Sequence, residues 1–150
     1  MVNKEGIAKK IDIKNKKASF EYFFLEEYSA GMVLTGTEIK SIRMSKFSLN
    51  ESFCIMMNDG LYVRGMNIAR YTEGTYNNHD PLRDRKLLLQ KKEIKRLSEK
   101  LKDQGNTIIP TRLFIGDNGL AKLEIALGRG KKLYDKRDTI KTRDLARERD

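Results

Sequence analysis

The C-terminal segment 129–150 limits how this chain can fold, because it cannot build a core of its own. It holds nine Lys or Arg and five Asp or Glu among its 22 residues. Its large apolar side chains are Leu133, Tyr134, Ile140 and Leu145. Burying so many charges costs more free energy than these few side chains return. We therefore expect a basic tail over 131–150 that is disordered until a partner surface orders it.

The chain as a whole is basic, with a formal net charge of +10 over 150 residues. Nucleic acid is the leading class of partner for such a charge. No apolar run approaches the roughly 20 residues of a membrane-spanning helix, so no membrane partner is expected. Cys54 is the single cysteine, which excludes an internal disulfide and favours a reducing cytoplasm.

The N-terminal part predicts a loose, lysine-rich arm over 1–17, followed by strands. Over 18–24, apolar side chains largely alternate with polar ones, which is the period of a half-buried strand. A second apolar run at 32–34 predicts another strand after the small residues that precede it. The folded body is therefore expected to span 18–130.

One helical turn is predicted over 38–43. Ile39 and Ile42 are three residues apart, and so are Lys40 and Arg43. A helix with this spacing buries the two isoleucines and presents the two cations to solvent.

Two β-hairpins are the clearest local prediction. The runs 53–57 and 61–68 flank an Asp-Gly turn, and the runs 108–115 and 120–127 flank a Gly-Asp-Asn-Gly turn. Alternation in the last run points Lys122 away from the core.

The segment between the hairpins predicts a helix that begins at Asp80 and Pro81 and ends at Gly105. A break is expected near Gln90, because the neighbouring leucines do not all share one face. The side chains that do share a helical face are Leu87, Ile94, Leu97 and Leu101.

Roughly five or six short strands with helical material between them favour a mainly β fold with added helices. An OB-like antiparallel β-barrel with about three helices and a flexible C-terminal tail fits best. Such barrels bind oligonucleotides through one face and its loops, in agreement with the charge.

Residues typical of catalysis or metal binding are few. His79 is the single histidine and has no second ligand at metal-binding spacing, so no metal or cofactor is expected. His79 is interpreted either as a loop residue hydrogen-bonded near a helix start or as an RNA contact, and the first is favoured. Cys54 lies in an apolar run and is expected to be buried. Glu38 and Asp59, the acids one would nominate for metal-assisted RNA cleavage, have no evident partners.

The candidate RNA-binding cations form two sets. The first is expected around the predicted helix start, where it is either a solvated surface or a phosphate-binding one. Its members are Lys40, Arg43, Arg83, Arg85, Lys86 and Lys122. The second set surrounds Tyr134, and a tyrosine among cations can stack on a base while its neighbours hold phosphates.

Three longer motifs add a family resemblance. They are GTEIKSIR at 36–43, NHDPLRDRKLLL at 78–89 and GKKLYDKR at 130–137. Together, in this order and spacing, they resemble the bacterial SsrA-binding protein family, small protein B. The resemblance runs in register from about residue 18 to the end.

The resemblance implies a non-enzymatic RNA-binding protein that mimics half a tRNA. Such a protein binds the tRNA-like domain of transfer-messenger RNA (tmRNA). It brings the charged RNA, and elongation factor Tu with it, to the A site of a stalled ribosome for trans-translation and nascent-chain tagging. The tail would fold as a helix in the mRNA channel of the small subunit. A cytoplasmic monomer is expected.

The resemblance also assigns residues to two surfaces. The RNA-binding face would be built or supported by Glu38, Lys40, Ser41, Arg43, His79, Arg83, Lys86, Leu88 and Lys122. The residues at the ribosomal decoding centre would be Lys131, Lys132, Tyr134, Asp135, Lys136 and Arg137.

Two alternatives stay open. A generic single-stranded RNA-binding or ribosome-associated OB-fold protein would share the charge and the barrel but would not prefer a tRNA-like elbow. An OB-type ribonuclease is less favoured and would cleave RNA in a metal-dependent way that is lost on Glu38→Gln.

Overall fold

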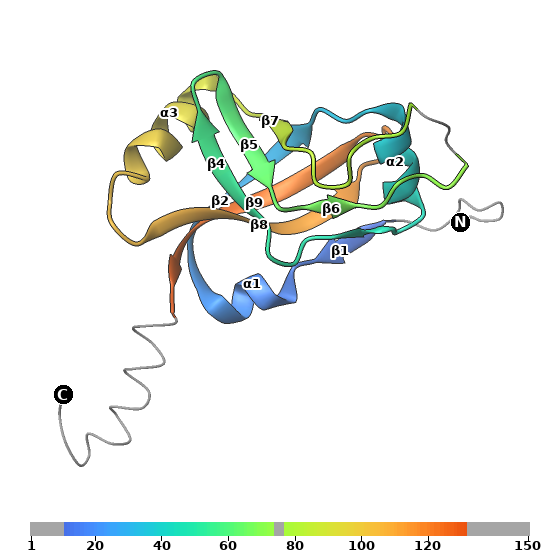
Figure 1. Ribbon diagram of the computed structural model, residues 1–150. Helices are drawn as coiled ribbons and strands as arrows, with labels where there is room; N and C mark the ends of the chain where they lie inside the picture. The colour runs from blue at the N-terminus through green and yellow to red at the C-terminus, as the bar shows by residue number, and fades with distance from the viewer. Residues whose placement is uncertain (1–10, 74–76, 132–150) are drawn as a thin grey trace, which may run out of the picture.

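The fold is an antiparallel β-barrel with helices packed on its outside (Figure 1). The computed structural model describes residues 11–73 and 77–131. The strands are β1 Asp12–Lys14, β2 Tyr22–Met32, β3 Phe47–Ser48, β4 Phe53–Met57, β5 Gly60–Arg64, β6 Asn67–Ile68, β7 Arg85–Leu88, β8 Asn106–Ile115 and β9 Ala121–Gly130. The helices are α1 Lys16–Glu21, α2 Gly36–Arg43 and α3 Lys91–Lys100.

Pairing of β8 with β9 closes the main sheet into a ring. The order around the ring is β8, β4, β5, β7, β2 and β9, and every neighbouring pair is antiparallel. β1 lies outside this ring on β8, and β3 pairs with β6 in a separate short sheet. The mainly β, OB-like barrel with added helices is thus confirmed, as are both predicted hairpins, β4–β5 and β8–β9.

The hydrophobic core lies inside the ring and is supplied by alternate residues of the strands. Leu61 and Val63 of β5 are fully buried, and so are Leu123 and Ile125 of β9. Because side chains alternate along a strand, the residues between them face outward. The residues of β7 that point inward are Arg85 and Leu87, and those that point outward are Lys86 and Leu88.

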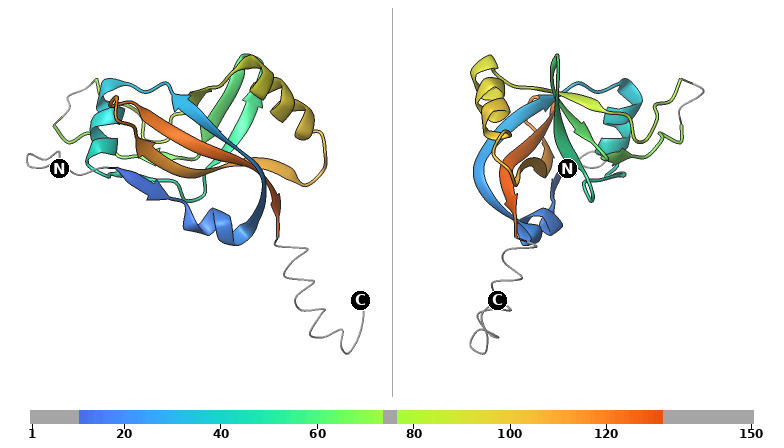
Figure 2. Two further views of the ribbon diagram at one scale, coloured as in Figure 1. Left: turned by 180° about the vertical axis from the view of Figure 1, so that it is seen from behind. Right: turned by 60° about the vertical axis from the view of Figure 1, so that its left-hand side comes forward.

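Each helix begins at an identifiable polar contact. Asn15 caps α1 by accepting from the backbone N–H of Ala18, and its amide donates to the carbonyl of Pro110 at 2.9 Å. Thr35 caps α2. Gln90 caps α3, and its backbone N–H donates to the carboxylate of Glu93 at 3.0 Å. Farther along α3, Nε of Arg96 donates to Glu26 of β2 at 2.9 Å. α2 and α3 lie at opposite ends of the barrel, and β7 runs between them (Figure 2). None of the helices described is long and apolar enough to cross a membrane.

The N-terminal predictions were partly wrong. The body begins before Ala18, since Asp12–Lys14 pairs with β8 and Lys16–Glu21 is helical. Asn15 caps this helix through the backbone N–H of Ala18, and its amide is held by the carbonyl of Pro110, which is 95 positions away and invisible to a local pattern. The two expected strands at 18–24 and 32–34 are replaced by one continuous strand, Tyr22–Met32.

The predicted helix over 80–105 was also wrong in its first half. Arg85–Leu88 is a strand paired with both β5 and β2, and the helix is confined to Lys91–Lys100. The alternation of buried and open positions along β7 was hidden, because one of the buried residues is the cation Arg85. The turn expected over 38–43 is confirmed as part of α2.

Candidate nucleic-acid interface

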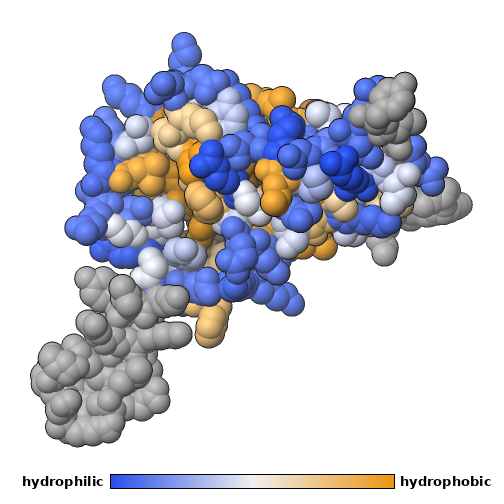
Figure 3. All heavy atoms as spheres, viewed as in Figure 1, coloured by the Kyte–Doolittle hydropathy of each residue, from blue (hydrophilic) through white to orange (hydrophobic). Residues whose placement is uncertain are grey.

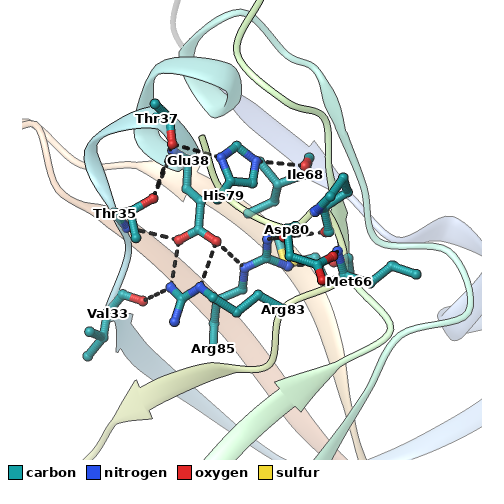
Figure 4. Close-up of polar contacts among 12 residues, drawn as sticks. Val33, Thr35, Thr37, Glu38, Met66, Ile68, His79, Asp80, Arg83 and Arg85 are labelled. Atoms are coloured by element: carbon teal, nitrogen blue, oxygen red, sulfur yellow. Dashed lines mark hydrogen bonds and ion pairs between the residues drawn. The ribbon is translucent and has the colours of Figure 1, made fainter. Parts of the chain in front are cut away.

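The carboxylate of Glu38 joins α2 to the segment around β7 through two arginines (Figure 4). Oε1 accepts from Nη2 of Arg83 at 2.7 Å, and Oε2 accepts from Nε of Arg85 at 2.8 Å. The backbone N–H of Thr35 donates to Oε1 at 2.9 Å, so the carboxylate also closes the capping box of α2. Glu38 is fully buried, and both of its oxygens are occupied.

The charge of Glu38 is maintained by these donors. Burial alone would raise the pKa of the carboxyl. The hydrogen bond from Arg83, the backbone hydrogen bond from Thr35 and the positive charge of Arg85 outweigh burial and lower the pKa to about 2. Glu38 is therefore an anion at neutral pH and a structural counter-charge.

Arg85 is a fully buried cation whose donors are all directed at the protein. Its Nη1 donates to the carbonyl of Met66 at 2.6 Å, and its Nη2 donates to that of Pro81 at 3.2 Å. Burial lowers the pKa of Arg85, and the charge of Glu38 opposes that shift. Sequence reasoning placed Arg85 in an exposed basic set, and the structure shows that this was wrong.

His79 fixes the loop before β7 against α2. Its Nε2 lies 2.9 Å from the carbonyl oxygen of Ile68, and its Nδ1 lies 2.8 Å from the hydroxyl of Thr37. A carbonyl oxygen only accepts, so Nε2 carries a hydrogen and donates to Ile68, while Nδ1 and the hydroxyl of Thr37 form the second hydrogen bond. The ring is buried and both nitrogens are engaged, which matches the interpretation of a hydrogen-bonded loop histidine.

Ser41 is likewise enclosed. It is fully buried in α2, and its Oγ has no hydrogen-bond partner among the residues that the structure describes. Its small side chain lets the helix lie close to the barrel. We call Glu38, Ser41, His79 and Arg85 the supporting group, because none of them is placed to touch a ligand on the surface.

Three of the other expected residues, Arg43, Leu88 and Lys122, line an open groove between α2 and the β8–β9 turn, which we call the α2 groove. Its cavity volume is about 620 Å³, and its floor includes Met32, Leu34 and Ile39. Leu88 and Leu120 are exposed beside it, by 54% and 60% respectively. Arg43 and Lys122 stand at its rim without an ion-pair partner within the described ranges.

The tip of the β8–β9 hairpin is built to approach α2. Gly119 has φ +82°, in the left-handed region that favours glycine. A Cβ atom at this position would lie 3.9 Å from the guanidinium of Arg43. The turn therefore places Leu120 and Lys122 next to Arg43. Sequence reasoning did not nominate Leu120, whose only signal was an apolar side chain directly after a turn.

Three further candidates lie outside this groove. Lys40 is exposed on α2 with its ammonium 5.4 Å from the ring centre of Tyr71. Arg83 is held by Glu38 and has a side chain 36% exposed. Lys86 lies near Asp59 across the β4–β5 turn, with 3.7 Å between its Nζ and the carboxylate.

The decoding-centre candidates are mostly outside the described residues, which end at 131. This applies to Lys132, Tyr134, Asp135, Lys136 and Arg137. Lys131 is described: its backbone N–H donates to the carbonyl of Glu21 at 2.8 Å, and its ammonium lies 5.0 Å from the ring centre of Phe23.

The acids nominated for catalysis do have partners, contrary to the sequence interpretation. Glu38 is enclosed by its arginines, and Asp59 accepts from the hydroxyl of Tyr62 at 2.8 Å. Cys54 is buried, which raises the pKa of its thiol. Over 11–73 and 77–131, no group of three or more His, Cys, Asp or Glu could hold a metal ion.

Comparison with known proteins gives consistent matches over most of the chain. The family model of the SmpB protein matches residues 12–150. The SsrA-binding protein of Cytophaga hutchinsonii is 58% identical over 95% of this chain and 93% of its own length. That of Parabacteroides distasonis is 56% identical over 98% of this chain and 96% of its own length.

A solved structure is also similar. It is described as "tmRNA-SmpB: a journey to the center of the bacterial ribosome", and its matching chain superposes with a TM-score of 0.71 at 40% sequence identity. The match covers 92% of this chain and 96% of that one.

Proposed function

The chain belongs to the SmpB family, and from this membership we propose that it is an SsrA-binding protein, an RNA-binding factor that binds tmRNA and acts with it on the bacterial ribosome in trans-translation. The observation that carries the proposal is the agreement of sequence and fold over nearly the whole chain. The barrel with an open groove rimmed by unpaired cations supplies the chemistry of an RNA-binding surface.

The RNA contacts proposed on the barrel come from the exposed residues of the α2 end. Arg43 and Lys122 would hold phosphates, while Leu88 and Leu120 offer apolar area to an unstacked base. Lys40, Arg83 and Lys86 are further candidates for phosphate contacts. The supporting group acts through these residues by fixing α2, β7 and the loop between them.

The ribosomal role is proposed for the basic tail. Lys131, Lys132, Tyr134, Asp135, Lys136 and Arg137 would meet ribosomal RNA at the decoding centre, and the remainder would occupy the vacant mRNA channel of the small subunit. A tail with few apolar side chains and many cations can order against phosphates without a core of its own. A ribosome that carries mRNA in that channel would exclude the tail, and this would distinguish stalled ribosomes from translating ones.

Elongation factor Tu would join through the charged RNA and not through a site on this chain. The protein would act in the cytoplasm, where ribosomes translate. The protein acts by binding alone. Glu38, the acid that a nuclease would need, is enclosed by Arg83 and Arg85.

A competition titration tests the proposal. The full chain is titrated at near-physiological salt with the tRNA-like domain of tmRNA, an elongator tRNA and a generic hairpin of equal length. We expect a marked preference for the tRNA-like domain. Equal, steeply salt-dependent binding to all three would instead identify a generic RNA-binding OB-fold protein.

Variants of the α2 groove locate the binding. Replacing Arg43 and Lys122 together by Ala should weaken binding and reduce the slope of log K against log salt by about 2, one per phosphate contact. Lys14→Ala with Lys16→Ala is the matched control, because both are exposed cations that do not line this groove.

Deletion of 131–150 separates the two surfaces. The truncated chain should bind the tRNA-like domain as the full chain does, yet fail to support tagging of nascent chains on ribosomes stalled without a stop codon. If tagging persisted at the level of the full chain, the division between barrel and tail would be wrong.

A further inference from the structure

A second groove lies at the other end of β7, between α3 and the β4–β5 hairpin. Its cavity volume is about 750 Å³, and we call it the α3 groove. Met56 from β4, Leu89 after β7 and Ile94 from α3 line it and are half-buried. Figure 3 shows apolar side chains gathered on this face near α3, surrounded by hydrophilic ones.

One stripe of α3 directs lysines at this groove. Lys91 and Lys95 are one helical turn apart, and Lys102 follows two turns later just beyond the helix end. All three line the groove and are exposed. The same helix turns Leu97 to the core and Arg96 to Glu26 on β2. One side of α3 thus packs on the core, a second pairs with β2, and the third faces the groove.

The lysines of the groove are not neutralised by ion pairs with other described residues. No ion pair involves Lys91, Lys95 or Lys102 in the described part of the chain, although Glu26, Glu38 and Asp84 are each paired elsewhere. Of the two acids lining the groove, Asp59 lies 3.7 Å from Lys86, which leaves Glu99 alone against three cations. The groove is therefore positive over an apolar floor.

The α3 groove adjoins the α2 groove at Leu88. This residue lines both cavities and is 54% exposed on the outer side of β7. Its neighbour Lys86 points to the same side of the strand and lines the α3 groove. A chain of nucleotides leaving the α2 groove across Leu88 would enter the α3 groove directly.

We propose that the α3 groove binds an unpaired stretch of the same RNA, adjoining the part held at the α2 groove. Phosphates would contact Lys91, Lys95 and Lys102, and the flat face of a base would pack on Met56, Leu89 or Ile94. Cations beside an apolar floor are the combination used for single strands, since a base has an apolar face and the backbone is anionic. The inference rests on the proposed function for the identity of the RNA.

Two double variants on one helix test this inference. Lys91→Ala with Lys95→Ala removes charge from the groove, and Lys92→Ala with Lys100→Ala removes the same charge from other positions of α3 that do not line it. Full-length chains are titrated with tmRNA over a series of salt concentrations. The groove double variant should bind several-fold more weakly and lower the salt slope by about 1 to 2, and the control should match the wild type.

Equal behaviour of the two double variants would overturn the inference. Unchanged RNA binding by the groove variant together with lost tagging activity would also overturn it, because the partner of the groove would then be something other than RNA. The same titration on a generic RNA keeps the two proposals distinguishable. A wild type without preference for tmRNA refutes the proposed function, whereas the comparison of the double variants still reports whether RNA occupies the α3 groove.

Discussion

The cations at the two ends of β7 have opposite surroundings. Arg83 and Arg85 converge on one buried carboxylate, whereas Lys91 and Lys95 on α3 meet no acid within ion-pair distance in the described residues. Both sets read as basic clusters in the sequence. The difference shows that the number of cations does not locate an RNA surface. What matters is whether the protein has already neutralised them.

The chemistry of the side chains matches this division. The planar guanidinium of arginine can donate to several fixed acceptors, as Arg85 does to Glu38, Met66 and Pro81. Lysine carries a strongly hydrated point charge on a long stem, which suits a solvent-exposed phosphate contact. Arg85 holds the barrel together, whereas Lys91 and Lys95 remain available to a ligand.

The largest expected effect comes from removing the shared counter-charge. Glu38→Gln leaves Arg85 buried without an anion and weakens the cap of α2, so we expect the free energy of unfolding to fall by about 3 to 5 kcal/mol. Urea denaturation followed by circular dichroism measures this change.

Glu26→Gln is the matched control for that variant. It removes the acid that pairs with Arg96, whose side chain is 55% exposed. The free energy of unfolding should fall by less than about 1 kcal/mol. Equal losses for the two variants would contradict the distinction between the buried network and the exposed pair.

Acid pH should have a somewhat smaller effect through the same carboxylate. The pKa of Glu38 is about 2 in the folded protein, against an ordinary value of 4.5. A lowered pKa stabilises the fold above pH 4.5, and that contribution is lost as the pH falls toward 2. The loss is of the order of 3 kcal/mol. The stability difference between wild type and Glu38→Gln should therefore narrow over this range in unfolding titrations, and a constant difference would refute the role of its charge.

The smallest effect on stability is expected at the unpaired lysines. Lys91→Ala with Lys95→Ala should change the free energy of unfolding by less than about 0.5 kcal/mol, because both side chains are exposed and neither makes an ion pair with another described residue. Thermal unfolding checks this. A loss of unfolding free energy above about 2 kcal/mol would mean that these lysines stabilise the fold, as Arg85 does, and would contradict the distinction between the two sets of cations.

The parts of the fold that could be predicted from the sequence are those with local causes. The β4–β5 and β8–β9 hairpins follow from short turns between apolar runs. The α1 helix and the strand β7 depend on distant partners. The amide of Asn15 donates to the carbonyl of Pro110. Arg85 can be buried because it pairs with Glu38, which is 47 positions away in the chain. No local pattern shows that a cation faces the core.

Most residues of the candidate site could be nominated from the sequence, but their burial could not be predicted. The family resemblance nominated Glu38, Ser41 and His79 together with Arg43 and Lys122, although the first three are buried and the last two stand at a groove. A motif brings together residues that a fold needs and residues that a ligand touches. Only burial and hydrogen bonding separate the two.

The three-residue strand β1 also bears on self-association. β8 is longer than its pairing with β4 requires, and β1 covers the remaining stretch, with Arg112 of β8 held to Asp12 by hydrogen bonds of 2.7 and 2.9 Å. An uncovered stretch of strand offers its backbone N–H and C=O groups to any extended chain. β1 occupies these groups, and because it is only three residues long it leaves a short edge of its own, which limits the addition of a strand from another molecule.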